Sequence, residues 1–203
     1  THPLYADPVW AAGKLLFVSS DLRLWCLDAR TGEALWRHWL LAHVNIGGEE
    51  VVTDELAAGG WYQSKPTAAK GVVFTGGPSH FVFALDCRTG REHWRCELGA
   101  AVSGSPAFAD GRIFVGQQGG EEDFYCLDAR TGRPLWKQAL GWVWSSANIR
   151  AGKVYVPGVD GYLNCLEAAT GKIVWRHRAG AAAHPEPPID RGRVFFGSWD
   201  HYV

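Results

Sequence analysis

Cysteines, histidines and carboxylates are the side chains that could bind a metal or take part in catalysis. The five cysteines form no CxxC spacing and no adjacent pair, and the eight histidines show no metal-ligand spacing, so neither a zinc nor a redox centre is supported. There is also no Gly-rich phosphate loop, no HExxH sequence and no serine nucleophile elbow. We therefore predict no catalytic residue and no metal site.

Two acidic clusters and two asparagines are weaker candidates for cation binding. Glu121-Glu122-Asp123 and Glu49-Glu50 could bind a cation, but solvated loop tips explain them better. Asn148 and Asn164 lack a glutamate at a defined position that would make either a credible Ca²⁺ ligand.

Composition and charge exclude several classes of protein. The chain has 203 residues, of which 47% are hydrophobic and 20% charged, and its formal net charge is −1. The high apolar content excludes a disordered tail. The net charge near zero argues against a bulk nucleic-acid binder and against a polybasic membrane-surface protein, because both need a strongly basic surface. No apolar run approaches the length of a membrane span. The chain has no methionine and no signal peptide, and it starts and stops inside a repeat, so we expect a processed or excised segment.

An internal repeat accounts for the 11 tryptophans and many of the 25 glycines. A segment of the form Leu-Asp-x-x-Thr-Gly-x-x-x-Trp occurs four times, with Glu in place of Asp in the last copy. A Gly followed by β-branched and aromatic residues precedes each copy, and the period is about 40 residues with one insertion of about 18. The repeated acidic residue, glycine and tryptophan are Asp28, Gly32, Trp36, Asp86, Gly90, Trp94, Asp128, Gly132, Trp136, Glu167, Gly171 and Trp175.

Each repeat is predicted to form four short antiparallel strands. Apolar residues alternate at period two, and turn residues recur at the spacing of a β-meander. The strands expected in the third unit are 106–109, 112–116, 124–128 and 133–140, with Asp110-Gly111 and Arg130-Thr131-Gly132 as turns. Pro134 suits an edge strand because it cannot donate to the ladder. Radial repetition of such units predicts an all-β fold, a β-propeller of four-stranded antiparallel blades.

We expect a single partial propeller over residues 1–203, with about four and a half blades. The blades span approximately 7–40, 64–98, 104–140 and 145–179, with an incomplete one at 185–203 and an insertion at 41–63. Each repeat tryptophan should wedge against the neighbouring blade, and each repeat carboxylate should accept backbone N–H groups across its turn. Cys26, Cys126 and Cys165 share one repeat position and are predicted to be small packing residues. Cys87 and Cys96 flank one hairpin without facing each other.

The motif Ala/Cys-Leu-Asp-Ala-x-Thr-Gly-x-x-x-Trp resembles the tryptophan-docking repeat of the pyrroloquinoline-quinone-like (PQQ-like) β-propellers, over residues 7–203. That bacterial family includes quinoprotein alcohol dehydrogenases, BamB-like lipoproteins and sensor domains attached to kinases. The resemblance implies a ring of seven or eight blades and a periplasmic or extracytoplasmic location. The remaining blades would come from a longer chain or from self-association, and an isolated open arc should dimerise or aggregate through its exposed edges.

The resemblance leaves two functions open. The quinoenzymes of the family use a disulfide of adjacent cysteines, a Ca²⁺ ligand set and an Asp base, and no such set is recognisable here. We therefore expect no cofactor and a non-catalytic binding or scaffolding module, with a protein or peptide partner or a sensed ligand. The alternative is a fragment of a PQQ-dependent dehydrogenase, with PQQ and Ca²⁺ held by blades outside the sequence.

A binding rim is predicted from the loops that lead into the inner strands. These positions vary within an otherwise repetitive frame, and aromatic residues from neighbouring loops should lie on the same face. Such a rim could hold a peptide, a sugar or a flat cofactor, although loop aromatics packing on one another would look the same. The candidate rim residues are Tyr5, Trp61, Gln63, Ser103, Trp142, Trp144, His184 and Trp199.

Overall fold

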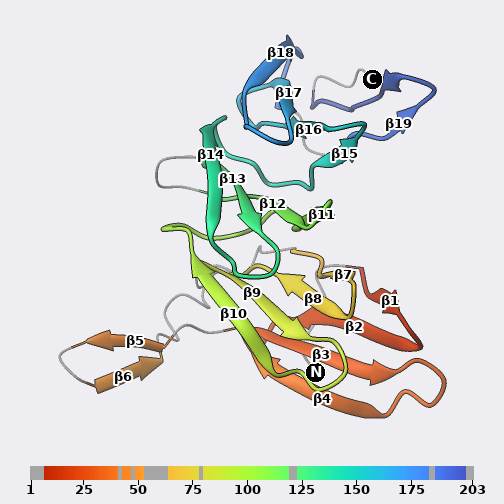
Figure 1. Cartoon of the computed structure of the whole chain (residues 1–203), viewed down its shortest axis with the longest axis vertical. Coiled ribbons are helices and arrows are strands. Elements are labelled where there is room, and N and C mark those ends of the chain that lie inside the picture. Colours follow the sequence, from red (N-terminus) through yellow and green to blue (C-terminus); the bar gives the residue numbers. More distant parts are fainter. Residues whose placement is uncertain are drawn as a thin grey trace. The chain divides into compact units, whose positions relative to one another are not determined.

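A computed structural model describes residues 7–40, 43–46, 49–52, 64–77, 80–118, 123–182 and 186–199. It contains strands and turns and, in this part of the chain, no helix (Figure 1). Two compact units, 1–102 and 103–203, divide the chain, and each is described by itself.

Unit 1 contains two four-stranded antiparallel sheets, the first two blades of the predicted repeat. Each sheet has its strands in sequence order, so each is a simple meander. A further hairpin, β5 paired with β6, lies in the predicted insertion. The strands are β1 Val9–Ala11, β2 Lys14–Ser19, β3 Arg23–Asp28, β4 Ala34–Trp39, β5 His43–Ile46, β6 Glu49–Val52, β7 Thr67–Ala69, β8 Val72–Thr75, β9 Phe81–Asp86 and β10 Glu92–Glu97.

Unit 2 contains two more four-stranded meanders and the two-stranded start of another. The four strands expected for the third unit are all present, within two residues of the predicted bounds, and Pro134 begins an edge strand as expected. The strands are β11 Ala107–Ala109, β12 Arg112–Gly116, β13 Asp123–Asp128, β14 Pro134–Ala139, β15 Asn148–Arg150, β16 Lys153–Pro157, β17 Tyr162–Glu167, β18 Ile173–Arg178, β19 Ile189–Asp190 and β20 Arg193–Val194.

The turn between the first two strands of each blade needs a left-handed backbone at two successive residues. At the predicted Asp110-Gly111 turn, φ is +49° and +75°, and the equivalent pairs in the other units have the same signs. This conformation matches the right-handed twist of the flanking strands, and glycine adopts it without steric cost.

The repeated aspartate stabilises the turn between the third and fourth strands of a blade by accepting backbone hydrogen bonds, as predicted. Asp128 Oδ1 accepts the backbone N–H groups of Arg130 at 3.1 Å and Thr131 at 2.8 Å, and Asp28 and Asp86 make the same pair of bonds. Glu167 accepts the Thr170 hydroxyl at 3.2 Å, as Asp86 and Asp128 accept theirs, but its longer side chain accepts no backbone N–H among the described residues.

The repeat tryptophan joins neighbouring blades within each unit. In unit 1, Trp36 donates its indole N–H to the Cys87 carbonyl at 3.2 Å, and a Cβ added at Gly90 would lie 2.7 Å from the ring. In unit 2, Trp136 donates to the Ala168 carbonyl at 3.1 Å, and a Cβ at Gly171 would lie 2.6 Å from the ring. The predicted wedge is therefore confirmed for these two tryptophans. The indole lies so close to the turn that only glycine fits there.

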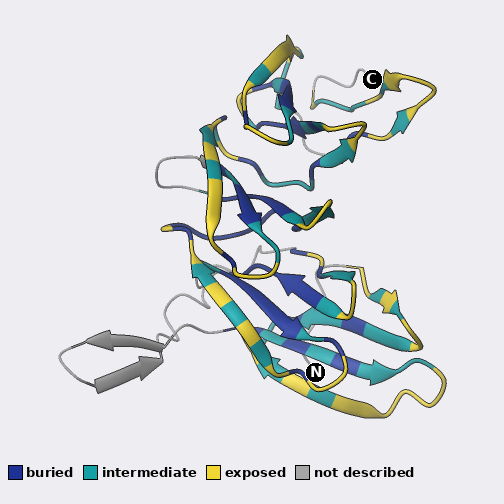
Figure 2. Ribbon diagram, in the orientation of Figure 1, coloured by how far each residue is buried: buried dark blue, intermediate teal, exposed yellow. Residues whose placement is uncertain are grey.

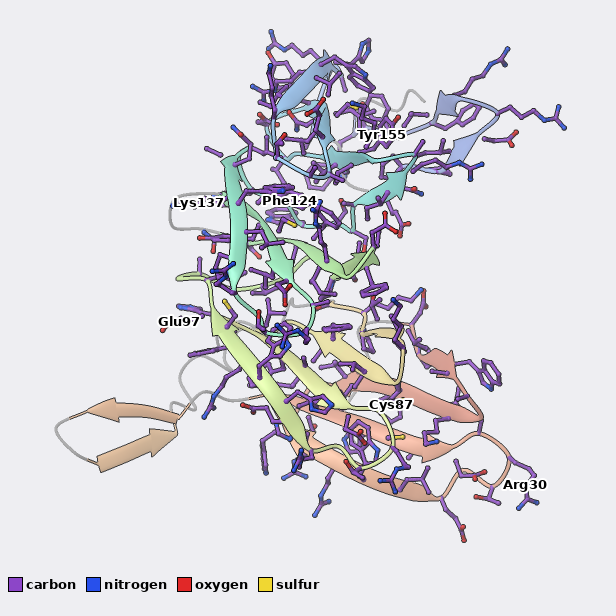
Figure 3. The ribbon with its side chains drawn as sticks, in the orientation of Figure 1. Arg30, Cys87, Glu97, Phe124, Lys137 and Tyr155 are labelled. Carbon is purple, nitrogen blue, oxygen red and sulfur yellow. The ribbon has the colours of Figure 1, made fainter. Side chains whose placement is uncertain are left out.

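Each unit has its own apolar core, shared by the two blades that the tryptophan joins. The core of unit 2 includes Phe114, Phe124 and Cys126, with Trp136 packed against it. Figure 3 shows Phe124 and Lys137 on opposite sides of the β13–β14 pair, as alternation along a strand requires. The two central strands of each four-stranded blade hold most of its buried residues, whereas the first strand is half-buried and the fourth is largely exposed (Figure 2). Cys26, Cys126 and Cys165 are all buried, which confirms their packing role.

Candidate functional site

Three of the predicted rim tryptophans form one cluster in unit 2. The ring centroids of Trp142 and Trp144 are 6.0 Å apart, and those of Trp144 and Trp199 are 6.3 Å apart. Trp144 is thus in contact with both of the other indoles. Trp142 is 39% exposed and Trp199 60% exposed, so the cluster presents aromatic surface to solvent. This surface, Trp142–Trp144–Trp199, is called the indole cluster below.

The loop that carries two of these indoles is tightly held. Val143 N–H donates to the Gln117 carbonyl at 3.3 Å, and Val159 N–H donates to the Trp142 carbonyl at 2.9 Å. A Cβ at Gly116 would collide with the Val143 side chain, and one at Gly104 would lie 2.8 Å from the Ser145 carbonyl. The loop backbone therefore packs directly on two glycines, which reduces the conformational freedom that binding would otherwise have to remove.

Buried polar atoms accompany this loop. Ser103 and Gln117 are only 6% and 2% exposed, and the described residues offer no hydrogen-bond partner to Ser103 Oγ, Gln117 Oε1 or Ser145 Oγ. Such atoms in native proteins are usually satisfied by ordered water or by a ligand. Ser103 was predicted as a rim residue, and its neighbour Gly104 contacts the Val143–Ser145 backbone, so the structure brings it to this loop.

Sequence reasoning missed Gln117 and Ser145. A glycine stands five residues after three of the five Gly landmarks, as Gly76 and Gly116 do, and this recurrence could have marked the region. Both glycines are packed against a valine, Val102 or Val143, so the close approach is itself a repeated feature.

Four predicted rim residues lie outside the described residues. They are Tyr5, Trp61, Gln63 and His184. The acidic pair Glu121 and Glu122 also lies outside them.

The described thiols are poor nucleophiles. Burial raises the pKa of Cys26 to about 11 and that of Cys126 to about 12, so both stay protonated at neutral pH. Within the described ranges no three His, Cys, Asp or Glu side chains gather as a metal site would require. No helix in these ranges is long and apolar enough to cross a bilayer.

The fold and the interblade contact together define a class, the β-propellers built from four-stranded blades with a docked outer-strand tryptophan. A family model described as "Outer membrane protein assembly factor BamB" matches residues 39–139 and 120–202. The chain therefore belongs to this PQQ-like, BamB-type repeat family.

Similar proteins include both BamB proteins and a dehydrogenase. The chain is 28% identical over 130 residues to outer membrane protein assembly factor BamB of Burkholderia pseudomallei, covering 64% of this chain and 34% of that protein. It is 27% identical over 212 residues to quinohemoprotein alcohol dehydrogenase ADH-IIG of Pseudomonas putida, covering 98% of this chain and 23% of that protein. The crystal structure of BamB from Moraxella catarrhalis superposes with a TM-score of 0.72 at 20% identity, over 97% of this chain and 56% of that chain. This chain thus spans about a third or less of the curated relatives it matches.

Proposed function

We propose that the chain is a non-catalytic binding module that holds a protein or peptide partner through the indole cluster. The observation that carries the proposal is the contact of three indoles on a tightly packed loop, with two of them open to solvent. Tryptophan is enriched among residues that dominate binding energy, and a held loop loses little entropy when a partner binds.

The family supports this proposal and suggests a location. A description as an outer membrane assembly factor fits a module that acts by contact with other proteins. It also favours an extracytoplasmic location in a bacterium, as the resemblance implied.

Binding to an array of extended peptides tests the proposal. The array carries aromatic and proline-containing peptides and is probed with the full chain and with variants that remove one exposed indole at a time. Trp142→Ala and Trp199→Ala should each weaken binding by about tenfold or more. Trp39→Ala is the matched control, because Trp39 is 49% exposed on β4 in the other unit. Equal loss in all three variants, or no saturable binding to any peptide, would overturn the proposal.

The second candidate is part of a quinone-dependent dehydrogenase, favoured by the similarity to a quinohemoprotein over 98% of this chain. The buried polar side chains identified beside the indole cluster, Ser103, Gln117 and Ser145, are uncharged and offer no cation to pair with an anionic quinone. These residues alone do not favour the quinone-dependent alternative, and no catalytic step is assigned to them.

Adding PQQ and Ca²⁺ to the full chain separates the two candidates. A scaffold should show no change in visible absorbance and no alcohol-dependent reduction of a redox dye. Saturable quinone binding with dye reduction would reject the non-catalytic proposal and support the dehydrogenase.

A further inference from the structure

A histidine lies in the contact between the two blades of unit 1. His38 belongs to β4 of the first blade, and its Nε2 lies 3.5 Å from Glu92 Oε2 on β10 of the second blade. Its ring also meets the Phe83 ring of β9 edge-on, at 6.1 Å between centroids. The His38 side chain is only 23% exposed. The imidazole therefore contacts two strands of the second blade and is largely removed from water.

Two charged side chains of the second blade face this imidazole. They are Glu92 and Arg95, whose Nε lies 3.5 Å from Glu92 Oε1. The Gly90 carbonyl, in the turn before β10, accepts a hydrogen bond from the ring. The side chains that meet the ring from β9 and lie opposite it on β3, Phe83 and Leu24, are uncharged. One carboxylate and one guanidinium thus act on the imidazole with opposite sign.

Burial between the blades makes the charged form of this histidine unfavourable. It lowers the pKa of His38 below its ordinary value of 6.5, because an imidazolium loses solvation there. Glu92 and the Gly90 carbonyl favour the charged form, and Arg95 opposes it. In the unfolded chain the ring is solvated, so it takes up a proton at a higher pH than in the folded chain. The contribution of His38 to stability is therefore present above pH 6.5 and declines as the pH falls below it.

The same strand carries the indole that joins these two blades. Trp36 and His38 are the half-buried residues in the alternating pattern of β4, so both side chains point to one side of the strand. Trp36 donates its N–H to the Cys87 carbonyl at 3.2 Å and packs its ring on Gly90. Since His38 bonds to the Gly90 carbonyl, the histidine and the tryptophan contact the same turn of the second blade.

We propose that this contact between the first and second blades is acid-sensitive, and that protonation of His38 weakens the docking of Trp36 on the 87–90 turn. Every group involved lies in unit 1, within or between two complete four-stranded sheets, so the contact requires neither unit 2 nor a further blade. It involves neither the indole cluster nor the proposed function. Unit 2 offers the natural comparison, because Gln138 stands two residues after the docked Trp136 and does not titrate.

Hydrogen exchange of the indole N–H groups, followed by NMR on the full chain, tests the proposal. Trp36 and Trp136 are measured in one sample, with their signals assigned from Trp36→Phe and Trp136→Phe. The ratio of their exchange rates removes the intrinsic effect of pH on exchange, since both are indole N–H groups bonded to a carbonyl. As the pH is lowered from about 7.5 to about 5, across the range where histidine titrates, the ratio of Trp36 to Trp136 exchange should rise.

His38→Gln should hold this ratio constant over the same pH range. The substitution places on β4 the residue that unit 2 already accommodates at Gln138, and both positions are half-buried. Circular dichroism melts near neutral pH establish that the variant is folded before its exchange is compared.

Glu92→Gln supplies an independent variant with the opposite expectation. Removing this carboxylate takes away the charge that favours the protonated ring, so Trp36 exchange should respond to acid more strongly than in the unaltered chain. Glu97→Gln is the matched control, because Glu97 lies exposed at the other end of β10. A ratio that does not change with pH in the unaltered chain would overturn the proposal. So would an equal rise in His38→Gln, or equal responses of Glu92→Gln and Glu97→Gln.

Discussion

Removing the docked indole Trp136 should destabilise unit 2 far more than removing its undocked counterpart Trp175. Replacing a buried tryptophan by alanine costs about 3–5 kcal/mol, and losing a hydrogen bond such as that to the Ala168 carbonyl adds about 1 kcal/mol. Because Trp136 is only partly buried, we expect a loss of about 3 kcal/mol for Trp136→Ala. Trp175 makes its ring contact with Tyr155 and has no hydrogen bond to the described residues, so Trp175→Ala should cost about 1 kcal/mol.

Urea unfolding monitored by circular dichroism measures this difference of about 2 kcal/mol. Both substitutions lie in unit 2, so the same transition is compared even if the two units unfold separately. The measurement is repeated at two protein concentrations, because any self-association would add to the apparent stability. Trp136→Phe separates packing from hydrogen bonding and should lose about 1 kcal/mol. Equal losses for Trp136→Ala and Trp175→Ala would refute the claim that the interblade contact stabilises the unit.

Three further outcomes are expected. Gly171→Ala should destabilise unit 2 by at least about 2 kcal/mol more than Gly152→Ala, since both have positive φ but only the former meets a docked ring. Hydrogen bonds from the turn hydroxyl and turn amides hold the pKa of Asp128 below 3.8, so its stabilising contribution is complete above pH 3.8. That contribution is lost as the pH falls through the lower folded-state pKa, and Asp128→Asn should flatten the acid limb of a stability–pH profile. Iodoacetamide at pH 8 should modify the half-buried Cys96 before Cys126, whose thiol is buried and has its pKa raised to about 12.

Each of these expectations has a contradicting result. Thermal melts in which the two glycine variants lose equal stability would deny the close approach at the turn. An acid limb unchanged in Asp128→Asn would show that the aspartate bonds do not persist in solution. Mass spectrometry that finds Cys126 alkylated as fast as Cys96 in the folded chain would contradict its burial.

Most of the fold follows from short-range patterns. The two-residue turns require a left-handed backbone. The pair Asp110-Gly111, which lies between two short apolar runs, therefore predicts such a turn from the sequence. In the repeated Asp-x-x-Thr spacing, the aspartate side chain accepts a hydrogen bond from the threonine N–H three residues later, as at Asp28 and Asp128. Glu167 shows the limit of that rule, because with one extra methylene its carboxylate keeps the bond from the turn hydroxyl and loses the two backbone bonds.

The candidate site was only partly foreseeable. Trp142, Trp144 and Trp199 could be assigned to loops of one face, but their mutual contact depends on how two separate segments fold back. Gln117 and Ser145 carry no local signature, since a glutamine or serine in a loop is usually solvated. Their burial follows from the close approach of the 143–145 backbone to Gly104 and Gly116.

Local sequence was enough to establish the blades, their turns and the tryptophan that joins them, because each depends on residues only a few positions apart whose conformational preferences act over one hairpin. Whether a given indole actually has a partner was decided by tertiary structure. Trp136 and Trp175 occupy the same position of the same motif, yet one is covered by a turn and the other is exposed. Burial depends on what a distant segment brings to the surface, and no property of the motif itself contains that information.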